Sequence, residues 1–382
     1  MVVINLFLVN NIRYKIYSLP FLISLIALSL FSVSCSKDPI REKAVAPENP
    51  DTTQNPTSYD EGIFVINEGN YNWGNASITF IDNRTNATVQ DLYQIANQHN
   101  LGDVAESMKI CNGFGFIVVN NSNRIEVVNL KNFKSVKSIT GLQSPRFLEL
   151  IDSTKAYVTN LQKDISILNL QSNTITGTIP IYGWTESLIR YDKYMLVTSI
   201  GKYSEPSSKR KAQILVIDTQ TDKIVDSIQT GKEPIGLVID KKQKVWVLCS
   251  GGFDNFEAPS LMRINPELRM VEKVFTFPTI TEVPSRLCIN NTGDTLYFLK
   301  GGVYQTPVTM TGLPTNPLIS ADGRLFYGLA IHPKTGCIYV SDSKDYVQNG
   351  TVYQYSPTAK FIKQYTAGRI PGGFCFTSKN AK

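Results

Sequence analysis

The residues that most often carry chemistry are sparse in this chain. It has two histidines, His99 and His332, and their separation in the sequence does not suit two imidazoles that hold one metal ion. A Ser-His-Asp hydrolase would need one of these histidines beside a nucleophile, and the sequence has no G-x-S-x-G motif. It also has no glycine-rich phosphate loop between a strand and a helix. We therefore expect a protein that is not an enzyme, with no catalytic residue, no metal ligand and no cofactor.

The cysteines do not suggest a disulfide framework. Five follow Cys35, an odd number, and they have no paired spacing. Three of them, Cys111, Cys288 and Cys375, fall within apolar strand sequences, where a thiol acts as a small core side chain.

Aromatic residues gather in four long polar segments: 67–75, 201–213, 250–260 and 341–350. Turns that only connect strands need no Trp or Tyr, whereas ligand sites use rigid aromatic surface with a few polar anchors. The ligand contacts predicted from these segments are Tyr71, Trp73, Tyr203, Phe253, Phe256 and Tyr346. The alternative is that each ring folds back and caps its own loop.

The elements that position these loops follow a repeat, which is clearest in residues 155–179. Three short runs, 156–160, 165–170 and 174–179, are separated by polar turns, and apolar residues alternate along the middle run. Alternation with a period of two and closely spaced turns predicts antiparallel strands joined as hairpins. A sheet this small needs neighbours of the same kind to bury its faces.

The repeat recurs around the chain. Seven copies of the first run end at Asn67, Asn120, Asn160, Ser199, Cys249, Lys300 and Asp342. Their spacing is close to the period of four-stranded propeller blades, and a further apolar run precedes most copies. Residues 372–376 resemble an innermost strand without a following copy, whereas 61–67 resemble a second strand without an innermost one. We predict an all-β fold, a seven-bladed β-propeller of four-stranded antiparallel blades, closed by the N- and C-terminal strands.

One position of the innermost strands should face the central axis. Alignment of the repeats places one set of residues at this position: Ser107, Arg146, Ser187, Ile235, Ser285, Tyr327 and Gly372. Arg146 offers a forked donor for a carboxylate, phosphate or amide oxygen, unless it pairs with Glu149 or another local acid. Trp184 lies just before its ring position, and Asn160 either faces the ligand or caps a backbone turn. Arg146, Asn160, Trp184 and Tyr327 therefore join the predicted ligand contacts.

The first 34 residues are expected to be a signal peptide. Arg13 and Lys15 precede an apolar run at 21–31, which is short for a membrane span, and small residues lead to Cys35. Cleavage by an ordinary signal peptidase is one interpretation; the other, which a lone cysteine at this place favours, is a bacterial lipoprotein acylated at Cys35. Residues 35–59 are then a proline-containing tether, and 60–378 form the propeller.

The charge balance does not suggest a nucleic-acid partner. Lys and Arg number 38 against 32 Asp and Glu, and loss of Arg13 and Lys15 with the signal leaves a formal charge of +4. No basic stripe interleaved with aromatic residues is present.

The repeated strand ends and the opening EGIFVINEGNYNWGNASITF resemble the YncE-type propellers, in particular lipoproteins displayed by gut Bacteroidetes. Members of that group include surface cobalamin-binding (BtuG-type) proteins. The resemblance covers residues 60–378 and implies an outer-membrane, lipid-anchored, surface-exposed protein. Such a protein binds vitamin B12 or another corrinoid and delivers it to a TonB-dependent transporter. The alternatives are a surface scaffold for another ligand or protein and, third, a lactonase-type hydrolase.

Overall fold

The computed structural model describes residues 58–202, 204–206, 209–252 and 257–377. Within these residues the chain forms seven antiparallel sheets of four strands each. The structure therefore confirms the predicted seven-bladed propeller. The predicted signal peptide, Cys35 and most of the predicted tether lie outside the described residues, as do Tyr203, Phe253 and Phe256.

Each blade contributes one strand to each of four concentric layers. The innermost strands are β4 (Ala105–Cys111), β8 (Pro145–Leu150), β12 (Trp184–Tyr191), β16 (Pro234–Ile239), β20 (Ser285–Ile289), β24 (Phe326–Ile331) and β28 (Pro371–Phe376). The second strands are β5 (Phe114–Val119), β9 (Lys155–Asn160), β13 (Tyr194–Gly201), β17 (Val245–Cys249), β21 (Thr295–Leu299), β25 (Ile338–Asp342) and β1 (Gly62–Asn67).

The two outer layers are less regular. The third strands are β6 (Arg124–Asn129), β10 (Asp164–Asn169), β14 (Gln213–Asp218), β18 (Ser260–Asn265), β22 (Gly302–Pro307), β26 (Asn349–Tyr355) and β2 (Ser77–Asp82). The outermost strands are β7 (Ser135–Thr140), β11 (Thr174–Pro180), β15 (Lys223–Gln229), β19 (Met270–Thr276), β23 (Ile319–Ser320), β27 (Phe361–Arg369) and β3 (Thr88–Val89). A short helix, α1 (Leu92–Asn97), follows β3.

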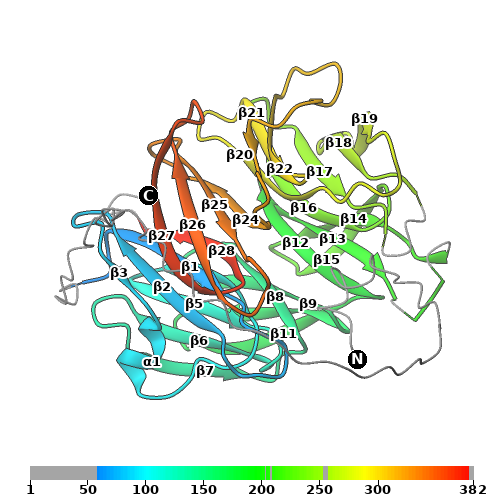
Figure 1. Ribbon diagram of the computed structural model, residues 1–382. Helices are drawn as coiled ribbons and strands as arrows, with labels where there is room; N and C mark the ends of the chain where they lie inside the picture. Colours follow the sequence, from blue (N-terminus) through cyan, green and yellow to red (C-terminus); the bar gives the residue numbers. More distant parts are fainter. Residues whose placement is uncertain (1–57, 203, 207–208, 253–256, 378–382) are drawn as a thin grey trace, which may run out of the picture. The chain divides into compact units, whose positions relative to one another are not determined.

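The ring is closed by the two ends of the propeller. Strand β28 pairs antiparallel with β1, and the innermost strands contact one another in the order β4, β8, β12, β16, β20, β24, β28 and back to β4. In Figure 1 the red β28 accordingly lies beside the blue β1. The hydroxyl of Thr377 also accepts a hydrogen bond from Gly62 N (2.5 Å) and donates one to Gly62 O (2.9 Å). This confirms the closure that the unmatched runs at the two ends predicted.

The core lies between blades rather than in one centre. One cluster packs Phe64 and Phe80 of the β1 blade against Ile117 of the next blade, and similar clusters fill the other junctions between the described blades. Burial of such side chains is the main favourable term, at about 1.5–3 kcal/mol for each large apolar residue. Tyr59, which the sequence analysis assigned to the tether, is buried in this first cluster and contacts Phe80 edge-on (ring centroids 5.1 Å apart). The packed propeller therefore begins before residue 60.

The cysteines behave as the sequence predicted. All five described cysteines are free thiols, and Cys111, Cys288 and Cys375 lie in innermost strands. Burial raises the pKa of the Cys288 and Cys375 thiols to about 12. His332 directly follows β24, beside a turn in which its main-chain N–H donates to Cys337 O (2.8 Å). No helix among the described residues is long and apolar enough to cross a membrane.

Candidate functional site

Strand direction divides the loops between two faces of the ring. We call the loop face the end formed by loops that lead into innermost strands and by loops that join second to third strands. The four long aromatic segments all join second to third strands, so their described residues lie on this face. The opposite end carries short hairpin turns, and we call it the turn face.

All seven innermost strands are irregular at the same place, close to the loop face. In six blades the register against the second strand shifts immediately after the first ladder pair, as it does between Ala105 and Ser107, between Pro145 and Leu148, and between Ser285 and Cys288. In β12 the register shifts after the first pair, at Trp184, and again after the second pair, at Thr185. A bulge re-aims the side chain of the extra residue. The first residues without a ladder partner at these shifts, taking the second shift in β12, are Glu106, Arg146, Glu186, Ile235, Arg286, Tyr327 and Gly372.

This set corrects the ring predicted from sequence. Arg146, Ile235, Tyr327 and Gly372 are at the predicted position, but Ser107, Ser187 and Ser285 are each displaced by one residue. The physical reason is that the register shift decides which residue is re-aimed, and an alignment of apolar runs does not show at which residue the shift falls. Two glutamates and a second arginine therefore occupy positions that the sequence assigned to serines.

Gly372 has no side chain, and Glu68 takes its place. Glu68 follows β1 in the same blade, and a Cβ atom built on Gly372 would overlap Glu68 Oε1. Tyr327 donates its hydroxyl to Glu68 Oε2 (2.8 Å), and Arg286 Nη2 pairs with Glu68 Oε1 (3.3 Å). We name the six polar residues Glu68, Glu106, Arg146, Glu186, Arg286 and Tyr327 the axial cluster.

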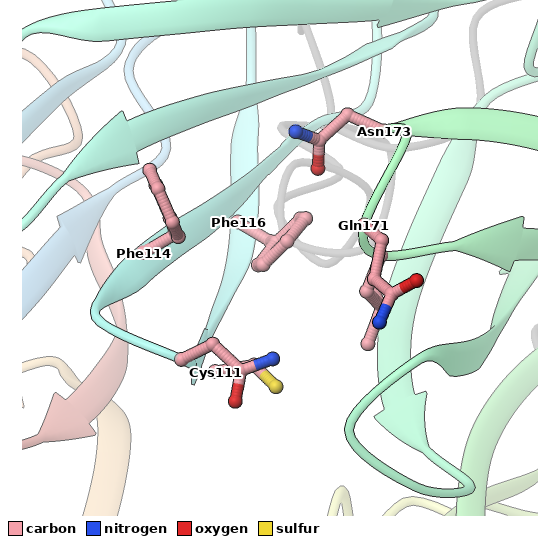
Figure 2. A pocket seen from close by; sticks show the side chains of 7 residues that line it. Cys111, Phe114, Phe116, Gln171 and Asn173 are labelled. Carbon is pink, nitrogen blue, oxygen red and sulfur yellow. The ribbon is translucent and has the colours of Figure 1, made fainter.

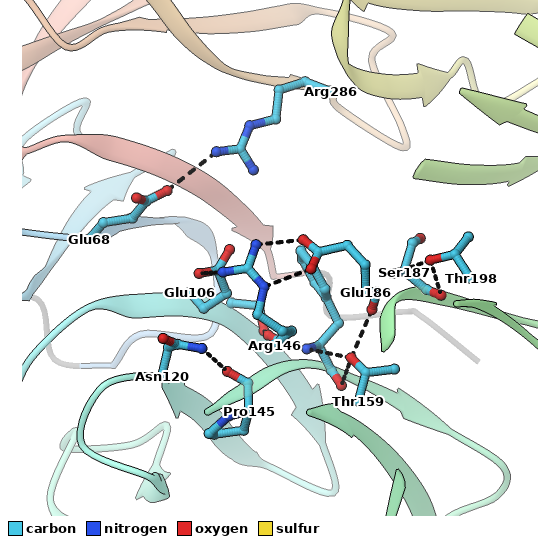
Figure 3. A network of polar contacts seen from close by, with 12 residues as sticks. Glu68, Glu106, Asn120, Pro145, Arg146, Thr159, Glu186, Ser187, Thr198 and Arg286 are labelled. Carbon is cyan, nitrogen blue, oxygen red and sulfur yellow. Dashed lines mark hydrogen bonds and ion pairs between the residues drawn. The ribbon is translucent and has the colours of Figure 1, made fainter. Parts of the chain in front are cut away.

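Three blades supply one half of the axial cluster. Arg146 forms a bidentate pair with Glu186, through Nε to Oε2 (2.9 Å) and Nη2 to Oε1 (2.5 Å), and its Nη1 donates to Glu106. Figure 3 shows these side chains converging, with Glu68 and Arg286 across from them. The alternative partner proposed for Arg146, Glu149, instead pairs with Lys109 (2.7 Å).

The charges of the cluster are strongly coupled. Burial raises the pKa of Glu106 to about 8; Arg146 opposes this rise, and Glu68 and Glu186 add to it. Burial alone would lower the pKa of Arg146, but Glu106 and Glu186 raise it. Burial, together with Glu68, holds the pKa of Tyr327 well above its ordinary value. Burial thus favours the uncharged form of Glu106, and the guanidinium of Arg146 opposes this preference.

The loop after β1 presents aromatic residues beside this cluster. Trp73 is 73% exposed, yet its loop is firmly bonded: Trp73 N donates to Asn70 O (3.1 Å) and Asn70 Nδ2 to Tyr346 O (2.7 Å). The ring of Tyr346 in turn packs edge-on against Tyr327 (6.0 Å between centroids). Tyr71 is half-buried in the same loop. The structure therefore brings four predicted residues, Tyr71, Trp73, Tyr327 and Tyr346, to one side of the axis.

The other predicted residues are placed differently. Trp184 begins β12 on the loop face and is half-buried, two residues before Glu186. Asn160 is 1% exposed, and its amide is used within its own blade: Nδ2 donates to Asp164 Oδ1 and Ser166 Oγ, both at 3.1 Å. Its Oδ1 accepts from Gln143 N (3.4 Å). We therefore remove Asn160 from the predicted ligand contacts, because the capping alternative describes it.

Sequence reasoning missed Glu68, Glu106, Glu186 and Arg286. An acidic or basic residue at the same step of four repeats was the available signal for three of them, but it becomes visible only when the position of the bulge is known. Among the described residues no group of three or more His, Cys, Asp or Glu side chains is placed to hold a metal ion.

A cavity of about 310 Å³ lies elsewhere, on the turn face. It is lined by the β4–β5 turn (Cys111, Asn112, Phe114), Phe116 and the β10–β11 turn (Leu170, Gln171, Asn173). Figure 2 shows these side chains around the gap between two neighbouring blades. It is separate from the axial cluster, which lies at the other end of the strands.

Comparison with known proteins gives one family match. Residues 61–371 match the family described as a domain of unknown function, DUF5074. No curated protein matches the chain.

Several solved structures have a similar fold. A quinonprotein alcohol dehydrogenase-like protein from Bacteroides thetaiotaomicron aligns with a TM-score of 0.64 and 17% identity, over 84% of this chain and 79% of that one. A periplasmic gluconolactonase from Pseudomonas aeruginosa aligns with a TM-score of 0.59 and 11% identity, over 83% and 99%. Hydrazine synthase from Kuenenia stuttgartiensis aligns with a TM-score of 0.57 and 14% identity, over 80% of this chain and 98% of that one. At these identities the likeness is one of fold.

Proposed function

This chain belongs to the DUF5074 family, and we propose that it is a binding protein that captures a small molecule on its loop face. The observation that carries the proposal is the convergence of the axial cluster: five of its six residues lie at the register shifts of innermost strands, and Glu68 joins them from the loop after β1. Bulges of this kind are frequent next to functional sites because they re-aim side chains. Aromatic loops border the cluster on the same face.

Binding without chemistry is the role that we propose for this cluster. Its three carboxylates already accept hydrogen bonds from Arg146, Arg286 or Tyr327. A set of donors and acceptors that is fixed before a ligand arrives loses little conformational freedom on binding, which favours affinity. The closed ring supports this rigidity because every innermost strand has two neighbours.

We propose a corrinoid, such as vitamin B12, as the ligand. A corrin is a broad ring edged with amide groups, and it carries a nucleotide tail. Exposed Trp73, with Tyr71 and Tyr346 near it, offers aromatic surface, while Glu68 and Arg286 offer an acceptor and a donor for polar groups at the edge. The resemblance of the sequence to the surface cobalamin-binding lipoproteins supports the same ligand.

We also propose that the protein is anchored in the outer membrane through acylated Cys35 and passes its ligand to a TonB-dependent transporter. The support is the sequence pattern before Cys35 and the same resemblance. Stable anchoring in a membrane needs more than one acyl chain, so we propose that Cys35 carries at least two.

The direct test mixes purified mature protein in detergent with cyanocobalamin and separates the mixture by gel filtration. We expect the red colour to elute with the protein, and titration calorimetry to give one site per chain. The lack of both signals would refute the corrinoid proposal. Turnover of a panel of lactones would instead support an enzyme, and capture of a transporter without corrinoid binding would support a scaffold.

A further inference from the structure

The two arginines of the axial cluster differ in how fully they are used. Arg146 has Nε and Nη2 on Glu186 and Nη1 on Glu106, and its side chain is 14% exposed. Two acids thus occupy its fork. Arg146 is a closed, structural ion pair and has little left to offer a ligand.

Arg286 keeps part of its fork open. Its Nε donates to the main-chain oxygen of Tyr327 (3.0 Å), and its Nη2 makes a long pair with Glu68 (3.3 Å). Its Nη1 has no hydrogen bond to the part of the chain that the structure describes, and the side chain is 27% exposed, about twice as much as that of Arg146. The two N–H groups of Nη1 therefore have no hydrogen-bond partner among the described residues, on a side chain that is only partly exposed.

The backbone and the neighbouring rings hold this guanidinium in place. Of the seven bulge residues, all of which the structure describes, only Arg286 has a left-handed backbone (φ 55°). For a residue with a side chain this conformation costs about 1–2 kcal/mol and persists where the surroundings enforce it, often at binding sites. The guanidinium lies over the Tyr327 ring (5.0 Å to its centroid), and Tyr327 is fixed by Glu68 and Tyr346. These contacts therefore fix the orientation of the Arg286 guanidinium.

We propose that Arg286 is the anchor for an oxyanion of the ligand, a phosphate ester or a carboxylate, bound through its open Nη1 edge. This rests on the binding role proposed above for the loop face. A planar fork matches the two oxygens of such a group and is stronger than a point charge in the same place. In a corrinoid the group of this kind is the phosphodiester of the nucleotide tail.

The rest of the cluster allows an added negative charge. Glu106 is faced by Arg146 and also interacts with Glu68, Glu186 and Arg286. Burial favours the protonated form of Glu106, which lowers the negative charge that an incoming anion meets, and Arg146 and Arg286 lie among the three carboxyl groups. The anion then competes with one long pair, that between Arg286 and Glu68, rather than with a closed fork.

The test compares two corrinoids and three variants by titration calorimetry. Cyanocobalamin has the phosphodiester, and dicyanocobinamide lacks it. We expect Arg286→Gln to weaken cyanocobalamin binding by about ten- to a hundredfold and to leave dicyanocobinamide binding unchanged. Arg286→Lys keeps the charge but loses the fork, so its loss should be intermediate. Arg369→Gln is the control, because Arg369 is exposed on the same face and its side chain bonds only Val347 O among the described residues (2.8 Å).

Unchanged cyanocobalamin binding in folded Arg286→Gln would overturn the anchor, as would an equal loss for both corrinoids. If the wild type binds neither corrinoid, the ligand proposal fails, and inorganic pyrophosphate tests the anchor by itself. A rise in Tm with increasing pyrophosphate concentration in the wild type and in Arg369→Gln, but not in Arg286→Gln, would support the role of Arg286 as the anchor. No rise in the wild type, or equal rises in all three proteins, would refute it.

Discussion

Glu68 lies in the space that a side chain at Gly372 would fill, so one blade supplies its axial group from the loop after β1 instead of from β28. We predict that Gly372→Ala displaces Glu68 from Arg286 and Tyr327 and lowers the free energy of unfolding by about 1–3 kcal/mol, as overpacking does. Urea denaturation measures this.

Two variants make that experiment specific. Gly373→Ala is the matched control, because its Cβ would lie 3.4 Å from Ile66 Cβ, an ordinary contact. In a Glu68→Ala background the cost of Gly372→Ala should shrink. Equal costs in both backgrounds would show that Glu68 is not what opposes the added methyl group.

A second prediction concerns pH. Burial raises the pKa of Glu106 to about 8 from an ordinary value of 4.5, so the folded chain binds one more proton than the unfolded chain between these values. The contribution of Glu106 to stability is thus fully present below about pH 4.5 and is lost as the pH rises through about 8. Its slope is at most about 1.4 kcal/mol per pH unit.

Denaturation curves of the wild type and Glu106→Gln between pH 6 and 9 test this expectation. The difference in free energy of unfolding between the two proteins should shift in favour of the variant as the pH rises. Glu149→Gln, beside Lys109 at a more exposed site, should not show the trend. Parallel curves for Glu106→Gln and the wild type would contradict the assignment.

A third prediction concerns the aromatic residues of the loop face. Trp73→Ala should weaken cyanocobalamin binding by about tenfold with little change in Tm, because the ring is 73% exposed and stabilises little of the fold. Trp184→Ala should also weaken binding, with some loss of stability because this ring is half-buried. Leu268→Ala, 67% exposed in a turn of the opposite face, should change neither. Unaltered calorimetric titrations for both tryptophan variants would remove them from the site.

A fourth prediction separates structure from binding at Asn160. Asn160→Ala leaves partners in the β9–β10 hairpin without their hydrogen bonds, and we expect a loss of about 1–3 kcal/mol in the free energy of unfolding. Affinity of the folded protein for cyanocobalamin should not change. A selective loss of affinity at unchanged Tm would restore Asn160 to the ligand contacts.

The repeat made most of the fold predictable. Strand ends such as Asn120 and Asn160 recur at the same step of the repeat, and the unmatched runs at 61–67 and 372–376 predicted the closure. The bulges were not predictable by the same reasoning, since a ladder shift leaves no mark on hydrophobic alternation. This is why Ser107 was chosen where Glu106 belongs.

The axial cluster was predictable only in part. Arg146 and Tyr327 were recognised because their strands aligned without a gap, but Glu68 reaches the axis through contacts with residues more than 200 positions away. Local pattern carries no information on such contacts. The burial of Asn160 was equally hidden, because its partners depend on the path of the β9–β10 hairpin.

The junction of β28 with β1 also has a consequence for biosynthesis. Gly62 and Thr377 are 315 positions apart. Strand β1 therefore keeps an unpaired edge until nearly the whole polypeptide has been synthesised. Gly372 arrives in that same final strand, next to Glu68. A truncated product would therefore lack both the closed ring and the complete axial cluster. Its unpaired β1 edge would be accessible to cellular proteases.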